Sequence, residues 1–429
     1  MKRLAFSAFT VFLVFCIHPL CPEEKPGVIT SIEITGLKRT KQHIARYPLE
    51  KFLGYEASDL DLNEIHATVI ETGILQPLEV ELVESGDGFV LHITVEEKWS
   101  IFPVPLVMLS SGDYTLGLFF ADTNAFGLRD IAAVGGIYGP SSWMALALYQ
   151  HTPNRIGLPG FSTFFMYGRD EREDADKNEK VHRRYTVDQL RFSLGLNYPF
   201  TEYLSSSLSL YFTDISLKEN AAAFNQPESG AMLLGISPSF TIRDSNWDGF
   251  LLSQRSINLT YEYNHALSGS SFHEAQLRLL YEQPIVPGFR ANFKSGAIWK
   301  SLAGFGTAGT GSSGSGAEGS GFDPLFEEGP HRALVDILPN NFSARTYAGF
   351  SAGLEKHLLK VSWGTLSVMG AWQGVFSDGP ISGFDFSHGP YIGTRFYLSR
   401  LALPAFGAGL ALNTSTGIFQ FAFNIGMEF

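Results

Sequence analysis

The feature that most restricts the fold of this chain is a repeated alternation of apolar and polar residues beyond Trp99, in segments of about ten residues. Successive side chains of a β-strand point to opposite faces, so each segment has one apolar face and one small or polar face. Clear examples are SSSLSLYFTDI (205–215), RSINLTYEYNH (255–265), EAQLRLLYEQ (274–283) and IFQFAFNIGMEF (418–429). Such segments, separated by turn residues, are typical of a transmembrane β-barrel.

Sixteen of these segments can be counted, an even number, as in bacterial outer-membrane barrels. They begin near residues 101, 113, 129, 143, 160, 187, 204, 232, 253, 272, 289, 348, 365, 389, 405 and 417. Short connections include 199–203 and 284–288, and long ones are 169–185, 216–231 and 302–347. We therefore predict an all-β transmembrane barrel of about 16 antiparallel strands over 101–429, with short periplasmic turns and long external loops.

The charge content limits the environment and the partners of the chain. Only 17% of the residues are charged, which is too few for an ordinary soluble surface on 429 residues. After the N-terminus no run of eighteen apolar residues occurs, so membrane-spanning helices are not expected. The net charge of −12 argues against nucleic acid as a partner, because no basic stripe is present to displace phosphate counterions.

The first 21 residues have the pattern of a secretory signal peptide. Lys2 and Arg3 precede a short apolar run over 4–17, which is too short to span a bilayer. We favour plain cleavage near residue 21 over lipidation of Cys21, because the small-residue context of a lipobox is missing. Since Cys16 is the only other cysteine, the mature chain forms no internal disulfide.

Residues 28–100 predict a small α+β domain in front of the barrel. A half-buried strand over 28–36 is followed by two helices, one over about 40–53 and one that begins beyond Asp61 and ends at Gly73. Two strands, 78–84 and 89–96, then form a hairpin around Ser-Gly-Asp-Gly. The predicted order is strand, helix, helix, strand, strand.

This order, with ITGLKRT at its start and LHITVEEKWSIFPVP at its end, resembles one polypeptide-transport-associated (POTRA) domain over essentially all of 28–100. The resemblance implies a periplasmic domain with an exposed sheet edge that an unfolded client extends by strand addition. A plain α+β spacer is the alternative, because edge strands are usually protected rather than used.

With a POTRA-like domain, sixteen strands and a terminal Phe429, the chain resembles the BamA/TamA superfamily of outer-membrane assembly and translocation proteins. LGLFFADTNAFGLRD (116–130) resembles the second-strand region of the family with its Asn-x-x-Gly turn. FTIRDSNWDGFLLS (240–253) resembles the family's Arg-Asp turn followed by glycine, here Arg243, Asp244 and Gly249. FQFAFNIGMEF (419–429) looks like the closing strand with its aromatic C-terminal signal.

The fourth stretch, SARTY (343–347), lies where the family has its Val-Arg-Gly-Phe/Tyr motif in the lumen. Arg345 and Tyr347 match that motif, but Ala344 and Thr346 replace its Val and Gly. In the family the arginine meets an acidic residue on the thirteenth strand, where AWQGVF (371–376) offers Gln373. An Arg-to-Gln contact implies a weaker lock than a charge-assisted pair. A solvated loop arginine is the alternative.

The first predicted strand, IFPVPLVML, contains Pro103 and Pro105, which cannot donate hydrogen bonds to a neighbouring strand. Their placement suggests a poorly paired seam with the closing strand, where Gly426 adds a kink near Phe429. We hypothesise that the first and last strands separate to admit a client hairpin or to open a path into the bilayer. Alternatively, the prolines lie in a linker just before the barrel.

Other sites are not supported by the sequence. The glycine-rich stretch 309–321 lacks the Gly-Lys-Ser/Thr ending of a phosphate-binding loop, and the charged run 169–184 lacks calcium-loop spacing. Histidines show no metal-binding spacing and no serine lies in a nucleophile elbow. We expect no metal, no cofactor and no enzymatic activity.

These features predict a protein of the bacterial outer membrane, with its N-terminal domain in the periplasm, that assembles or inserts β-barrel proteins. The implied partners are unfolded outer-membrane clients, outer-membrane lipid and periplasmic accessory proteins. A pore that translocates one dedicated partner is the main alternative. A structural or adhesive surface barrel, whose external loops bind host or matrix, is the third.

Overall fold

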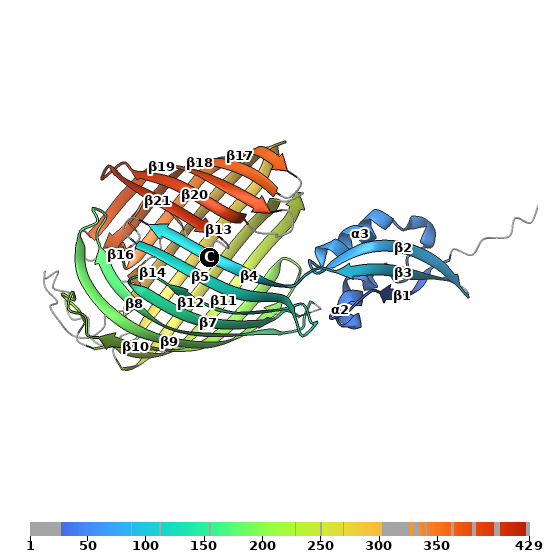
Figure 1. Ribbon diagram of the computed structural model, residues 1–429, viewed down its shortest axis with the longest axis horizontal. Helices are drawn as coiled ribbons and strands as arrows, with labels where there is room; N and C mark the ends of the chain where they lie inside the picture. Colours follow the sequence, from blue (N-terminus) through green and yellow to red (C-terminus); the bar gives the residue numbers. More distant parts are fainter. Residues whose placement is uncertain are drawn as a thin grey trace, which may run out of the picture. The chain divides into compact units, whose positions relative to one another are not determined.

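The computed structural model describes residues 27–425 except 87, 111–112, 154–155, 228, 249–250, 269, 303–326, 329–333, 340, 362–363, 380–382 and 399–403. The chain divides into two compact units, Met1–Lys98 and Trp99–Phe429 (Figure 1). The predicted signal peptide, 1–21, lies outside the described residues. Within the described part, no helix has both the length and the apolar character needed to cross a membrane.

The N-terminal unit has the predicted order of elements around a three-stranded sheet. Its elements are β1 (Ile29–Thr35), α2 (Gln42–Arg46), two 3-10 helices (Tyr47–Phe52 and Ala57–Asp59), α3 (Leu62–Glu71), β2 (Leu75–Ser85) and β3 (Gly88–Glu97). The sheet order is β1-β3-β2, with β1 parallel and β2 antiparallel to β3. The single helix predicted over 40–53 is wrong: it splits at Pro48 into α2 and a 3-10 helix, because proline cannot donate the helical hydrogen bond.

The α3 helix connects a local sequence signal to the core of this unit. Asp61 caps its start by accepting a hydrogen bond from the Asn63 N–H at 2.8 Å, and Gly73 follows its end with φ 77°. Ile65 and Val69 then face the sheet and join a buried apolar cluster with Ile32, Leu91 and other residues of β1 and β3. The domain therefore has a hydrophobic core of its own.

The C-terminal unit is a closed barrel, and the prediction of sixteen antiparallel strands is confirmed for the described residues (Figure 1). The strands are β4 (Ile101–Ser110), β5 (Asp113–Ala125), β6 (Asp130–Tyr138), β7 (Ser142–His151), β8 (Gly160–Ala175), β9 (Val181–Pro199), β10 (Leu204–Lys218), β11 (Ala231–Asp248), β12 (Leu251–Ser268), β13 (Phe272–Val286), β14 (Phe289–Leu302), β17 (Thr346–Val361), β18 (Gly364–Gly379), β19 (Gly383–Leu398), β20 (Pro404–Asn413) and β21 (Ile418–Ile425). Two short strands, β15 (Glu327–Glu328) and β16 (Ser343–Ala344), pair with each other. The largest errors in the predicted strand starts are at β9 and β19, which each begin six residues earlier than predicted.

The outer face of the barrel is apolar, as strand alternation requires. On β5, for example, Leu116, Leu118 and Phe120 are exposed, and equivalent large apolar residues are exposed on the other long strands. The buried polar and charged residues of the unit include many inward positions of the same strands, such as Glu355 and Gln373. An apolar outer face and a polar interior are the arrangement typical of transmembrane β-barrels.

The connections differ between the two ends of the barrel. At the end where β4 begins, here called the short-turn end, the strand bounds leave connections of fewer than ten residues, such as 200–203 and 287–288. The opposite end, here called the long-loop end, holds the two longest, 219–230 and 303–345. The charged segment 169–185, predicted as a loop, is mostly strand: β8 and β9 extend through it and leave only 176–180 as the turn.

Candidate functional site: the barrel lumen and its seam

Residues 334–345, at the end of the longest connection, pack against the inner wall of the barrel. Their apolar side chains form a buried cluster with Ile298, Tyr347 and Val375 of the wall; the cluster includes Leu334, Val335, Ile337, Leu338, Phe342 and Ala344. The neighbouring wall residues Trp299 and Phe376 are exposed, so by strand alternation Ile298 and Val375 point inward. This inserted segment, 334–345, therefore occupies part of the lumen.

Two reciprocal hydrogen bonds attach the inserted segment to β18. The Asp336 N–H donates to Gln373 Oε1 at 2.8 Å, and Gln373 Nε2 donates to Asp336 Oδ2 at 3.0 Å. Gln373 is buried, so these bonds are shielded from water.

Arg345 does not contact Gln373, so this part of the prediction is wrong. Its guanidinium pairs with the carboxylate of Asp378 on β18, and its backbone N–H donates to the Asp378 carbonyl at 3.0 Å. The register explains the difference: Thr346, next to Arg345, lies opposite Asp378, whereas Gln373 lies opposite Ser351. The side chain of Arg345 is 44% exposed, so the pair is partly hydrated.

Tyr347, the other residue of the predicted lumen motif, is fully buried in the cluster. Its hydroxyl accepts a hydrogen bond from the Ala344 N–H at 2.7 Å and donates to the Phe342 carbonyl at 3.4 Å. Tyr347 therefore fixes the turn by which the inserted segment enters β17.

The hairpin of β8 and β9 holds the inserted segment from another side. Asp174 Oδ1 accepts from the Ser343 hydroxyl at 2.7 Å, and Glu173 Oε2 accepts from Asn341 Nδ2 at 3.1 Å. The Ala175 N–H donates to the Asn341 carbonyl at 2.8 Å. The inserted segment is thus held by hydrogen bonds to β18 and to β8, which are far apart in the sequence.

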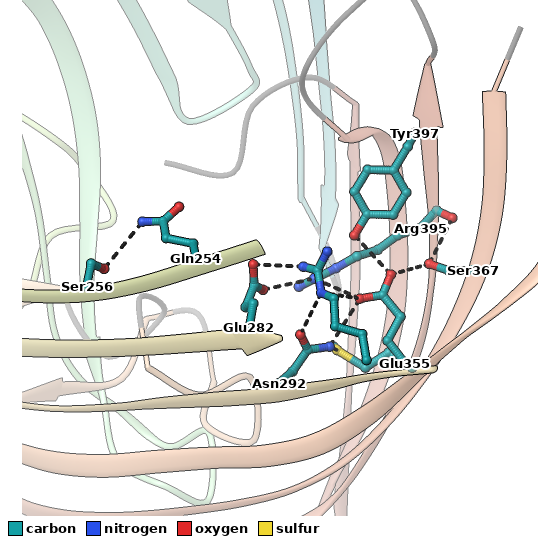
Figure 2. A network of polar contacts seen from close by, with 10 residues as sticks. Gln254, Ser256, Glu282, Asn292, Glu355, Ser367, Arg395 and Tyr397 are labelled. Carbon is teal, nitrogen blue, oxygen red and sulfur yellow. Dashed lines mark hydrogen bonds and ion pairs between the residues drawn. The ribbon is translucent and has the colours of Figure 1, made fainter. Parts of the chain in front are cut away.

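A second group of inward residues forms a buried charge network near the short-turn end (Figure 2). Arg290 Nη2 of β14 lies 2.7 Å from Glu282 Oε2 of β13, and its Nε lies 3.7 Å from Glu355 Oε2 of β17. Arg395 Nη1 of β19 lies 3.7 Å from Glu282 Oε1 and 3.9 Å from Glu355 Oε2. Two cations and two anions therefore balance in a site of low exposure, which a buried charge requires.

Glu355 is the centre of this network, with 0% of its side chain exposed. It accepts hydrogen bonds from Asn292 Nδ2 at 3.1 Å, from the Tyr397 hydroxyl at 2.9 Å and from the Ser367 hydroxyl (Figure 2). The network joins β13, β14, β17, β18 and β19 into one wall. Sequence reasoning missed it; the available signal was a set of charged residues at inward positions beside short turns.

The seam is the contact between the first and last barrel strands, β4 and β21. Three registered pairs of described residues join them: Leu109 with Phe423, Met108 with Asn424, and Val107 with Ile425. By contrast, β20 and β21 share eight pairs over described residues, and β4 and β5 share ten.

Both prolines lie inside β4, so the alternative that placed them in a linker before the barrel is wrong. Pro103 and Pro105 are exposed and stand opposite Phe120 and Leu118 of β5. Being two residues apart, their nitrogens face the same neighbouring strand. The predicted seam residues Gly426 and Phe429 lie outside the described residues.

The predicted Arg-Asp turn is not a turn. Arg243 and Asp244 lie within β11, opposite Ser256 and Arg255 of β12, because the strand continues to Asp248. Gly249 lies outside the described residues. The predicted Asn-x-x-Gly turn is present: the Gly127 N–H donates to the Asn124 carbonyl at 3.0 Å, with φ 72° at Gly127.

Within the described ranges, no group of three or more His, Cys, Asp or Glu side chains is arranged to hold a metal ion. The described carboxylates of Asp174 and Glu355 instead accept hydrogen bonds from hydroxyl groups. The described residues provide three features: a wall stabilised by buried charges, an inserted segment in the lumen, and a seam with three registered pairs of described residues.

Comparison with solved structures identifies the same fold in outer-membrane proteins. BamA from Haemophilus ducreyi lacking POTRA domains 1–3 matches with a TM-score of 0.59 at 13% identity, covering 94% of this chain and 85% of that chain. CdiB from Acinetobacter baumannii matches with a TM-score of 0.60 at 13% identity, covering 93% and 73%. CdiB from Escherichia coli matches with a TM-score of 0.61 at 14% identity, covering 93% and 76%.

No family model and no curated protein matches the sequence. The structural matches confirm the predicted resemblance to BamA-type barrels at the level of the fold.

Proposed function

We propose that this chain, which has the barrel fold of BamA and CdiB, resides in the bacterial outer membrane and assembles or inserts β-barrel proteins there. Its N-terminal domain acts in the periplasm as a POTRA-like receiver of unfolded clients, and outer-membrane lipid surrounds the barrel. Periplasmic accessory proteins are further candidate partners. The activity needs no catalysis and no cofactor, because strand addition and membrane insertion form no covalent bonds.

The observation that carries this proposal is the seam. Three registered pairs join β4 and β21 over the described residues, and β4 contains two prolines that donate no hydrogen bonds. Pro103 and Pro105 remove two N–H donors from β4, and each ladder hydrogen bond contributes about 0.5–1.5 kcal/mol net, so the pairing of this strand is weakened. A seam that parts presents two strand edges on which a client hairpin can form.

The N-terminal sheet supports the receiving role. The order β1-β3-β2 leaves the outer edge of β2 without a strand partner among the residues that the structure describes. An extended client segment can add to this edge through main-chain hydrogen bonds, which tolerate many sequences.

Translocation of a dedicated partner through the lumen is the second candidate. It is favoured by the inserted segment, which is tied to the wall largely by side-chain contacts that can be exchanged. It is disfavoured by the same segment in its observed position, because its apolar cluster occupies lumen space that a translocating chain needs.

The first test is quantitative proteomics of the outer membrane after depletion of the protein in its native host. A broad fall in barrel proteins supports assembly. Loss of one secreted or surface protein supports dedicated translocation. No change in other proteins overturns both and supports a surface role.

The mechanism is tested by locking the seam. Cysteines at the registered pair Leu109 and Phe423 are oxidised to a disulfide, and a matched control joins Leu196 and Leu208, which are registered between β9 and β10. We expect the seam lock, and not the control, to stop client assembly until reductant is added. Unimpaired assembly by the locked seam refutes the seam mechanism.

A further inference from the structure

The turn between β8 and β9 reaches the opposite side of the seam. In the barrel order, β8 and β9 follow β4 on one side of the seam, whereas β19, β20 and β21 precede it on the other. Nevertheless Lys177 of the turn forms an ion pair with Asp385 of β19. Glu179 Oε1 of the same turn accepts a hydrogen bond from Gln420 Nε2 of β21 at 2.9 Å.

The turn that makes these contacts is well ordered by its own hydrogen bonds. Asp176 Oδ1 accepts from the backbone N–H groups of Asn178 at 2.9 Å and Lys180 at 3.1 Å. Asp176 Oδ2 lies 3.2 Å from His182 Nε2. Lys177 and Glu179 are therefore presented from a preformed turn, so little conformational entropy is lost when they bind.

The contact with β21 lies close to the seam itself. Gln420 is three residues from Phe423, which forms the pair with Leu109 nearest to the long-loop end among the described seam pairs. When β4 and β21 part, β21 must move away from the wall that carries β8 and β9. The contacts of Lys177 and Glu179 then have to break.

The residues of β8 next to this turn hold the inserted segment. Asp174 binds Ser343, and Ala175 binds Asn341, next to the turn that reaches β19 and β21. The hairpin of β8 and β9 thus contacts the inserted segment and also β19 and β21 on the far side of the seam. Seam opening and movement of the inserted segment are therefore mechanically linked through β8 and β9.

We propose that residues 176–180 form a strap that holds the seam closed at the long-loop end, and that its release is a step of lateral opening. This inference rests on the proposed function in assuming that the seam opens. The strap is a weak lock because its contacts are weak. Partly exposed ion pairs and hydrogen bonds each shift the equilibrium between the closed and the open seam by about two- to fivefold. A lock of this strength can be released by a bound client.

The test uses the full-length protein in lipid nanodiscs, with spin labels on Leu116→Cys of β5 and Leu410→Cys of β20. Both positions face outward and flank the seam. Pulsed electron–electron double resonance measures the distribution of distances between the two labels. The fraction of molecules with a long distance is the open population. We expect Lys177→Glu to raise the open population about two- to fivefold, because it places a like charge beside Asp385.

Two further variants make the result decisive. Lys180→Glu changes the same charge on an exposed residue of the same turn that has no ion pair within the described residues, and it should leave the distances unchanged. The charge exchange Lys177→Glu with Asp385→Lys should restore the closed population. If Lys177→Glu behaves like Lys180→Glu, or if the exchange does not restore closure, the strap is refuted.

This readout is separate from client assembly. Should the strap variants shift the distances while a locked seam leaves assembly unimpaired, the strap stands and the proposed function fails. If the locked seam stops assembly while the distances do not respond to Lys177→Glu, the proposed function stands and the strap fails.

Discussion

Replacement of Glu355 by glutamine should be among the most destabilising single changes in the barrel wall. The substitution keeps the size of the side chain but removes its negative charge. Glu355 is fully buried, with Arg290 at 3.7 Å and Arg395 at 3.9 Å from its Oε2. After the change, Glu282 is the only anion of the described network that faces these two arginines.

The expected loss follows from the contacts of the carboxylate. Removing one partner of a buried ion pair costs about 3–5 kcal/mol, because the remaining charge is left desolvated and uncompensated. The side chains of Asn292, Tyr397 and Ser367 all donate hydrogen bonds to the Glu355 carboxylate. In glutamine one of the two accepting oxygens becomes an NH2 group, which cannot accept these bonds. We therefore expect Glu355→Gln to lower the free energy of unfolding by about 3 kcal/mol or more.

The measurement is urea unfolding of the protein from lipid vesicles, followed by tryptophan fluorescence. Arg169→Gln is the matched control: it removes a cation that is nearly half exposed, and Asp188 keeps Lys218 at 3.2 Å. It should cost far less than Glu355→Gln. Adding Arg395→Gln to Glu355→Gln restores the charge balance and should recover part of the loss. A loss below about 1 kcal/mol for Glu355→Gln would refute the reasoning, since exposed pairs already reach that value.

Three further predictions concern other parts of the chain. Burial raises the pKa of Glu97, but backbone N–H groups of residues 38–40 lower it further, so the folded pKa lies below the ordinary 4.5. The stabilisation is present above the unfolded pKa and is lost as pH falls through the folded pKa. The hydrogen-exchange protection factors of residues 38–40, which correct for the slower intrinsic exchange in acid, should therefore fall as the pH is lowered, and Glu97→Gln should flatten that dependence. Gly36→Ala should destabilise by more than the roughly 1–2 kcal/mol of backbone strain, because its φ is +90° and a Cβ would meet the Val95 carbonyl oxygen at 2.0 Å; Gly54→Ala, with φ +84° and nothing within 4 Å, should show the strain alone in thermal unfolding, and equal losses would contradict this. Gln373→Ala removes both hydrogen bonds to Asp336, so channel conductance in planar bilayers should rise, and an unchanged conductance would argue against this attachment.

Much of the architecture could be predicted because its signals are local. A strand is indicated by apolar and polar residues that alternate along it and by turn residues at its ends. Both signals are present in segments such as 255–265 and 274–283. The strand count and the outward apolar face follow from that pattern. The first helix of the N-terminal unit was mispredicted where a local rule was overlooked, at Pro48.

The candidate site depends on residues that meet only after the barrel closes. The motif around Arg345 indicated a loop in the lumen, but its partner is Asp378 rather than Gln373, because the register between β17 and β18 places Asp378 beside it. Likewise the buried network around Glu355 includes a contact between Glu282 of β13 and Arg395 of β19, which are not neighbouring strands in the barrel.

The sequence by itself therefore determined the class of fold, the number of strands and which residues face outward from the barrel, since alternation along one strand decides these. Only the tertiary structure decided which charges meet in the lumen, how the inserted segment is held and where residues 176–180 reach. These depend on register and on side chains crossing between strands, and a shift of one residue would turn each inward side chain to the opposite face.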